Sequence, residues 1–254
     1  MRIEVAGNTH VGMKRNHNED NFLILPDEHL CCVADGMGGH ASGEIASRIA
    51  VDELAEFFRM TSRDQDATWP FKMEKSRNYD ENRLATGIKL ANKSIFDKAC
   101  SDAKYKGMGT TIVSVHFTPS SAYVAHVGDS RVYYFRQGML RQVTEDHSLL
   151  NDYLKAKKLT PEEIENFPHK NVIVRALGMK EMVVVDVSRV EPQQGDIFLL
   201  CSDGLSGMVS DQHMQELLTR TSELETACTQ LIDMANAAGG NDNVTCVLAR
   251  YHAA

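Results

Sequence analysis

The chain carries the sequence LCCVADGMGG at residues 30–39. Residues 30–34 are apolar and suit a buried strand, and Asp35 and Gly36 follow where that strand ends. An Asp-Gly pair alone is most often a hairpin turn. Here the next residues, MGGHASG and then a helical pattern from Ile45 onward, offer no partner strand. A hairpin turn therefore does not explain the Asp35-Gly36 pair.

The same arrangement recurs three times. A carboxylate beside a buried strand is costly to remove from water, and several of them together repel one another unless a multivalent cation neutralises them. Oxygen ligands of this kind suit Mg²⁺ or Mn²⁺. The pattern therefore predicts one shared metal site. The further carboxylates are Asp129 after the run 122–127, Asp203 after 197–202, and Asp242 before 244–251.

A dinucleotide site is an alternative interpretation of the same loop. Residues 36–41 match the pattern G-x-G-x-x-A between a strand and a helix, which is the arrangement of a dinucleotide-binding turn. Asp35 would then face the pyrophosphate, and no parallel strand–helix–strand unit follows. The metal site is the stronger prediction.

Short apolar runs along the chain predict strands, and their short connections favour antiparallel sheets. Helical spacing of apolar residues on either side of the polar stretch 61–83 predicts two helices joined by a loop. Ser222 and Glu225 are spaced as a helix capping box. We expect one α+β domain with helices outside the sheets. The predicted strands are 21–25, 30–34, 111–117, 122–127, 131–136, 182–187, 197–201 and 244–251.

Composition narrows the class of protein. The 254 residues are 43% hydrophobic and carry a net charge of −8, which supports a folded core and argues against nucleic acid or an anionic membrane as a partner. No apolar run reaches the ~20 residues that a membrane helix needs, and the first residues lack an apolar signal core. We expect a cytoplasmic protein. None of the six cysteines has an arginine six positions later, so a thiolate phosphatase loop is absent from the sequence.

Taken together, these motifs resemble those of the metal-dependent type 2C protein phosphatases, in particular the bacterial branch. The resemblance covers residues 4–251 and rests on several motifs in family order. The motifs are RNHNED at 15–20, DGMGG at 35–39, GTT at 109–111, GDSR at 128–131, DH at 146–147, RALG at 175–178, SDG at 202–204 and DNVT at 242–245.

The resemblance implies a site with two Mg²⁺ or Mn²⁺ ions. Asp35 would bridge the two ions, and Gly36 would contribute its carbonyl oxygen. Asp203 and Asp242 would ligate one ion of the pair, and Glu19 would act through metal-bound water. Asp35 and Asp203 are thus the expected catalytic residues.

Two further roles follow from the resemblance. Arg15 would bind the substrate phosphate, for which a bidentate guanidinium is well suited. Asp129, with Asp203, would hold a third ion.

This sequence has Met37 where some members carry a histidine proposed as general acid, so the general acid stays unassigned. We expect Arg131 to pair with an internal carboxylate and His147 to be an orienting or structural group.

The implied fold is a two-sheet antiparallel β-sandwich flanked on both sides by helices, in four α-β-β-α layers. It forms a single phosphatase domain over residues 4–251, with a surface flap at about 148–170. The implied reaction is hydrolysis of phosphoserine and phosphothreonine in proteins by in-line attack of a metal-bridging hydroxide. Phosphorylated proteins are the expected partners, a serine/threonine kinase among them, and a monomer is expected. The alternative is a catalytically silent, phosphoprotein-binding regulator of the same fold.

Overall fold

The computed structural model describes residues 1–38, 42–64, 66–156 and 172–253, and two antiparallel sheets dominate them. One sheet has the strand order β1-β11-β10-β7-β8. Its strands are β1 (Arg2–His10), β7 (Arg131–Arg136), β8 (Met139–Gln142), β10 (Ile197–Cys201) and β11 (Val244–His252).

The second sheet has the order β2-β3-β5-β6-β9, and the short strand β4 pairs with β3. Every strand pair in both sheets is antiparallel. The strands are β2 (Asp20–Leu25), β3 (Leu30–Met37), β4 (Gly109–Thr110), β5 (Ile112–Thr118), β6 (Ser121–Val127) and β9 (Asp186–Val190).

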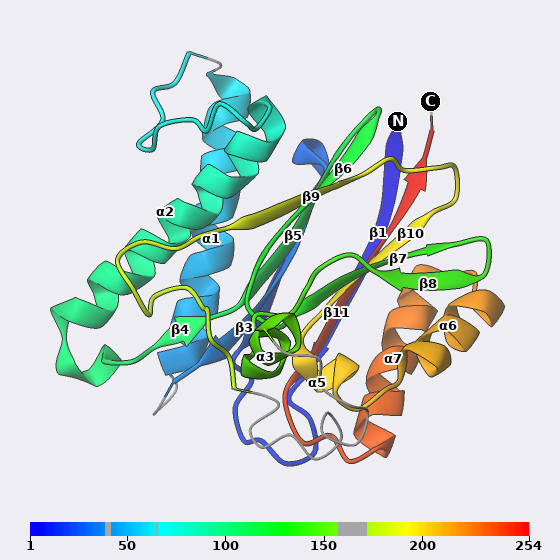
Figure 1. Cartoon of the computed structure of the whole chain (residues 1–254). Helices are drawn as coiled ribbons and strands as arrows, with labels where there is room; N and C mark the ends of the chain where they lie inside the picture. Colours follow the sequence, from blue (N-terminus) through cyan, green and yellow to red (C-terminus); the bar gives the residue numbers. More distant parts are fainter. Residues whose placement is uncertain (39–41, 65, 157–171, 254) are drawn as a thin grey trace.

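Helices cover the outer face of each sheet (Figure 1). Helices α1 and α2 lie on the side of the second sheet, and α6 and α7 lie on the side of the first. The predicted four-layer α-β-β-α sandwich is therefore confirmed. The described helices are α1 (Ser42–Arg63), α2 (Tyr79–Ser101), α3 (Leu149–Ala156), α5 (Asp203–Ser206), α6 (Asp211–Arg220) and α7 (Leu224–Ala237), with single 3₁₀ turns at Pro26–Glu28 and Ala103–Tyr105. None of these helices is both long enough and apolar enough to cross a bilayer.

Apolar side chains fill the three spaces between the four layers. Leu54 of α1 and Ile88 of α2 are fully buried in the layer beneath the helix pair. Between the sheets, Phe117 of β5 and Phe198 of β10 meet edge to face with ring centroids 5.1 Å apart. This pair joins the two sheets through their inner faces, so it is a central contact of the sandwich.

Three predicted boundaries of secondary-structure elements were wrong. Residues 182–185 do not join a ladder, because β9 begins at Asp186 and pairs with β6 only from there. The loop between the first two helices is shorter than the predicted stretch 61–83, because α1 continues to Arg63 and α2 begins at Tyr79 behind a capping box. The N-cap of α7 is Glu223 rather than Ser222, and its carboxylate accepts two backbone hydrogen bonds.

Three strands were not predicted. β4 is only two residues long, Gly109–Thr110, and pairs with β3. β1 has the sequence RIEVAGNTH, which lacks a continuous apolar run, and it forms because β11 pairs with it along its whole length. β8 is a short, mostly exposed edge strand that pairs only with β7. Of the flap predicted at 148–170, residues 149–156 form α3, and residues 157–171 lie outside the described part of the chain.

We expect Phe198→Ala to lower the free energy of unfolding by about 3–5 kcal/mol, because it removes a large side chain from a closed core. Urea denaturation followed by circular dichroism measures this change. Met139→Ala is the control, since Met139 is 53% exposed and such surface changes stay within about 0.5 kcal/mol. Equal stability of the two variants would contradict the packing of the sheets described here.

Candidate metal centre and active site

Three predicted carboxylates come together where strands from both sheets end. Asp35 lies near the end of β3, Asp203 is the first residue of α5, and Asp242 directly precedes β11. The Asp203 carboxylate lies within hydrogen-bonding reach of the Asp35 carboxylate, and the charge of Asp242 also acts on it. The structure therefore brings together residues that are separated by more than 160 positions in the chain. Figure 1 shows the ends of β3 and β11 and the short helix α5 in this region.

Mutual repulsion and burial act on these carboxylates in the same direction. Burial, followed by the charges of Asp20 and Asp203, raises the pKa of Asp35 well above its usual range. Burial and the charge of Asp242 likewise raise the pKa of Asp203. Asp35 and Asp203 are thus disfavoured as anions by burial and by their neighbours, which is the condition that a bound cation relieves.

A further aspartate, Asp20, lies at the centre of this cluster, and the sequence analysis gave it no role in the site. Asp20 opens β2 directly opposite Asp35 of β3. Its Oδ2 accepts hydrogen bonds from the hydroxyls of Ser202 at 2.8 Å and Thr245 at 2.7 Å. Oδ1 has no partner although the residue is only 5% exposed. Burial raises the pKa of Asp20 to about 7. An aspartate directly before the predicted strand 21–25 was the sequence signal for it.

Asp129 has the same character at the end of β6. It is 8% exposed, and its Oδ1 has no hydrogen-bond partner. Burial, and then the charge of Asp203, raises its pKa to about 7. The preceding Gly128 has φ +114, and a Cβ on it would lie 2.6 Å from the side chain of Thr111. Only glycine fits at that position, so the turn that carries Asp129 depends on it.

Glu19, which precedes β2, and Gly36 of β3 pack against one another beside the first turn of α1. The Glu19 backbone amide donates to Asn243 Oδ1 at 2.8 Å, and the Glu19 carbonyl accepts from the Gly36 amide at 3.2 Å. A Cβ on Gly36 would lie 2.2 Å from the carbonyl oxygen of Gly43. The Glu19 side chain accepts from the Gly43 amide, and burial raises its pKa. The site therefore needs glycine at position 36 for the close approach of three chain segments.

Arg15 lies at the exposed rim of the cluster. Its side chain is 51% exposed, and its Nη2 donates to Asp242 Oδ2 at 2.7 Å. The hydrogen bond to Asp242 is the main cause of its raised pKa, and the charges of Glu19 and Asp35 add to it. The guanidinium thus contacts one of the predicted carboxylates and still faces solvent, as a phosphate-binding group must.

Arg131 forms the ion pair that was predicted for it, with donor–acceptor distances of 2.7 and 3.0 Å to Asp146. It therefore serves the structure of the loop rather than the substrate. Met37 ends β3 and is partly exposed. His40, the nearest histidine in sequence, lies outside the described residues.

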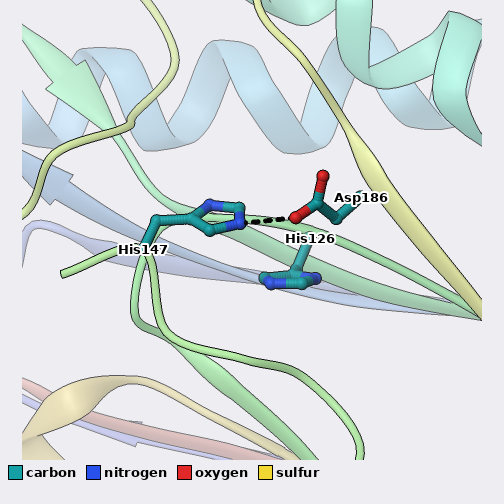
Figure 2. A group of neighbouring side chains, drawn as sticks. All are labelled: His126, His147 and Asp186. Atoms are coloured by element: carbon teal, nitrogen blue, oxygen red, sulfur yellow. Dashed lines mark hydrogen bonds and ion pairs between the residues drawn. The ribbon is translucent and has the colours of Figure 1, made fainter. Parts of the chain in front are cut away.

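A second group of potential ligands lies beside the Asp129 turn (Figure 2). The ligand atoms of His126, His147 and Asp186 all lie within 4.8 Å of one another. Among the described residues no other three such side chains, the acidic cluster included, approach one another this closely. The imidazole rings of His126 and His147 stack with centroids 4.5 Å apart, and burial lowers the pKa of both. The sequence analysis expected an orienting or structural role for His147 and did not consider His126 and Asp186.

Comparison with known proteins agrees with this architecture. The chain is 38% identical over 244 residues to the serine/threonine phosphatase Stp of Listeria monocytogenes, covering 93% of this chain and 91% of that protein. It superposes on the Mycobacterium tuberculosis serine/threonine phosphatase PstP with a TM-score of 0.85 at 33% identity, over 99% of this chain and all of that one.

A second structure of the PstP catalytic domain, in complex with two manganese ions, matches with a TM-score of 0.80 at 33% identity, over 98% of this chain and 97% of that chain. The family model for protein phosphatase 2C matches residues 6–249. The match runs through all six strands of the second sheet and both helix pairs. The chain belongs to the protein phosphatase 2C family.

Proposed function

We propose that this chain is a metal-dependent protein serine/threonine phosphatase that hydrolyses phosphoserine and phosphothreonine in proteins. The observation that carries the proposal is the contact between Asp35 and Asp203 inside a buried acidic cluster, with the Arg15 guanidinium at its rim. The relatives named above are serine/threonine phosphatases. These points favour an enzyme over a silent regulator, which would not need the full set of carboxylates.

The donor atoms fit two Mg²⁺ or Mn²⁺ ions. The cluster offers carboxylate and carbonyl oxygens, which these ions prefer. Buried carboxylate oxygens of Asp20 and Asp129 have no protein partner, and unpaired buried acceptors of this kind are costly without a cation. The two manganese ions in the PstP catalytic domain support the same assignment.

The proposed ligands follow from this fit. Asp35 would bridge the pair of ions, Gly36 would contribute its carbonyl oxygen, and Asp203 and Asp242 would bind one ion of the pair. Glu19 contributes through water. Asp129, together with Asp203, holds a third ion, which the unpaired Asp129 Oδ1 supports.

When bound, the ions activate a water molecule and offset charge on the phosphoryl oxygens. The residues of the chain provide the rest. Asp20 is held by Ser202 and Thr245 and offers its unpaired Oδ1 as a hydrogen-bond acceptor to water at the centre of the cluster. Arg15 transfers its hydrogen bonds from Asp242 to the substrate phosphate and orients it for in-line attack.

The biological setting is also part of the proposal. The substrates are phosphorylated proteins, including those of a serine/threonine kinase whose signal this phosphatase reverses. The enzyme acts as a cytoplasmic monomer. Residues 4–251 form one catalytic domain, in which α3 (Leu149–Ala156), the described part of the predicted flap, influences substrate choice.

We expect phosphate release from a phosphothreonine peptide in the presence of Mn²⁺, and loss of that release in EDTA. Asp203→Asn should lower the rate at least about 100-fold, because loss of a direct ligand costs no less than loss of a ligand's own partner. Asp233→Asn, an exposed carboxylate on α7, is the control and should retain activity. Equal turnover of the two variants, with unchanged circular dichroism, would refute the site.

We expect Arg15→Ala to raise KM for the phosphothreonine peptide about 10–100-fold, since a charge-assisted hydrogen bond contributes about 1.5–3 kcal/mol. The value of kcat should change less. Lys14→Ala removes an exposed cation next to it and should leave KM within about twofold of the native value, because an exposed charge outside the site contributes little. If neither KM nor kcat changes in Arg15→Ala, Arg15 does not bind the phosphate.

The raised pKa of Asp20 predicts how the stability of the metal-free protein depends on pH. Its pKa rises from 3.8 to about 7 on folding, so the folded state holds a proton that the unfolded state has released. This stabilisation is complete below pH 3.8 and is lost as the pH rises toward 7. Metal-free protein should therefore have a lower Tm at pH 7.5 than at pH 5.0.

Each kcal/mol of stability lost lowers the Tm of a chain of this size by roughly 2–4 °C. Differential scanning calorimetry at several pH values measures the slope. In Asp20→Asn the slope should be smaller, since the amide does not titrate, and saturating Mn²⁺ should remove it in the native protein. A metal-free Tm that rises from pH 5.0 to 7.5 would contradict this account.

A further inference from the structure

His147 makes hydrogen bonds on both sides of its ring, and these bonds determine where its hydrogen lies. The Gly128 amide donates to His147 Nδ1 at 3.0 Å, so Nδ1 is an acceptor and carries no hydrogen. The hydrogen is therefore on Nε2, which donates to Asp186 Oδ2 at 2.9 Å. Figure 2 shows this bond. The carboxylate thus fixes the tautomer of the imidazole.

This tautomer argues against the group as a metal site, despite its short distances. A metal bound at Nε2 needs the lone pair that the hydrogen occupies. Arg175 Nη1 also lies 3.1 Å from Nε2 and donates to Asp186 Oδ1 at 3.1 Å. The Asp186 carboxylate already accepts hydrogen bonds from His147 and Arg175. His147, Asp186 and Arg175 therefore form a complete hydrogen-bond network.

The network ends on the turn that carries Asp129. Besides the Nδ1 bond, the His147 amide donates to the Gly128 carbonyl at 2.9 Å. The peptide groups on both sides of Gly128 are thus held by one residue. Gly128 stands at φ +114, in a region that most residues avoid, so its conformation depends on such external contacts.

The ring itself is held from the opposite side. His126 stacks on it with an interplanar angle of 20°, and His126 Nε2 is bonded to the Glu145 carbonyl at 2.8 Å. His126 and Asp186 are cross-strand partners in β6 and β9. The Val174 amide donates to the His147 carbonyl at 2.9 Å. The position of His147 is therefore fixed by β6 and β9 of the second sheet together with the loop residues Glu145 and Val174.

We propose that His147 is a positioning residue that holds the Gly128–Asp129 turn and thereby sets the affinity of the metal ion bound by Asp129. The inference rests on the proposed role of Asp129 as a metal ligand. His147 does not touch the ion. It acts by keeping the Asp129 carboxylate aimed at the acidic cluster, where its Oδ1 has no protein partner.

The test compares His147→Leu with His147→Asn. Leucine removes the acceptor for the Gly128 amide, whereas the asparagine Oδ1 can take the place of Nδ1. Mn²⁺ binding is measured by electron paramagnetic resonance of the free ion, together with isothermal titration. We expect His147→Leu to weaken only the Asp129-dependent ion, about 10–100-fold, and His147→Asn to restore most of that affinity.

A double-mutant cycle tests whether His147 acts through Asp129. In an Asp129→Asn background, His147→Leu should cause no further loss of Mn²⁺ affinity. A persisting loss there, an equal loss in the Leu and Asn variants, or no loss at all would overturn the proposal. Phosphate release by the native protein with Mn²⁺, measured in parallel, tests the proposed function separately, since it depends on Asp35 and Asp203.

Nitrogen-15 NMR of the native protein provides a test that needs no variant, in case His147→Leu does not fold. The hydrogen of the His147 ring is expected on Nε2, with Nδ1 showing the chemical shift of an unprotonated acceptor and the Gly128 amide protected from exchange. A hydrogen on Nδ1 would overturn the proposal, because the bond from Gly128 would then be absent.

Discussion

Asp20 of β2 accepts hydrogen bonds from Ser202 and Thr245, so a buried carboxylate links the two sheets at the end where the acidic cluster lies. The same side chain stands opposite Asp35. An aspartate in this position is costly to bury, and the two hydroxyls offset part of that cost. The inter-sheet core and the helix layers must hold these groups together against their repulsion.

The glycine positions reflect the same constraint. At Gly36 and at Gly128, atoms of another chain segment lie within 3 Å of the position that a Cβ atom would occupy. Close approach lets backbone carbonyls and carboxylates from separate loops converge on a small volume. The active site is in this sense built from backbone as much as from side chains, and its charge is what a divalent cation is suited to balance.

Much of the fold was predictable because its strands are apolar and continuous. β3 and β10 are buried along most of their length, and such runs read clearly in sequence. β1 was missed because its pairing with β11 supplies the stability that its composition does not indicate. The start of β9 was misplaced for a related reason, since residues 182–185 have strand-like composition but no partner strand.

The sequence alone determined that Asp35, Asp203 and Asp242 are candidate ligands, because each adjoins a run too apolar to tolerate a lone charge and their motifs follow the family order. Only the tertiary structure decided that Asp20 belongs with them and that His147 faces Gly128. Asp20 bonds to Ser202 and Thr245, which lie 182 and 225 positions away, and His147 bonds to Gly128 across 19 positions. An apolar run beside a carboxylate indicates from the sequence that the carboxylate is costly to bury. Its hydrogen-bond partners in other loops and sheets depend on how the whole chain packs.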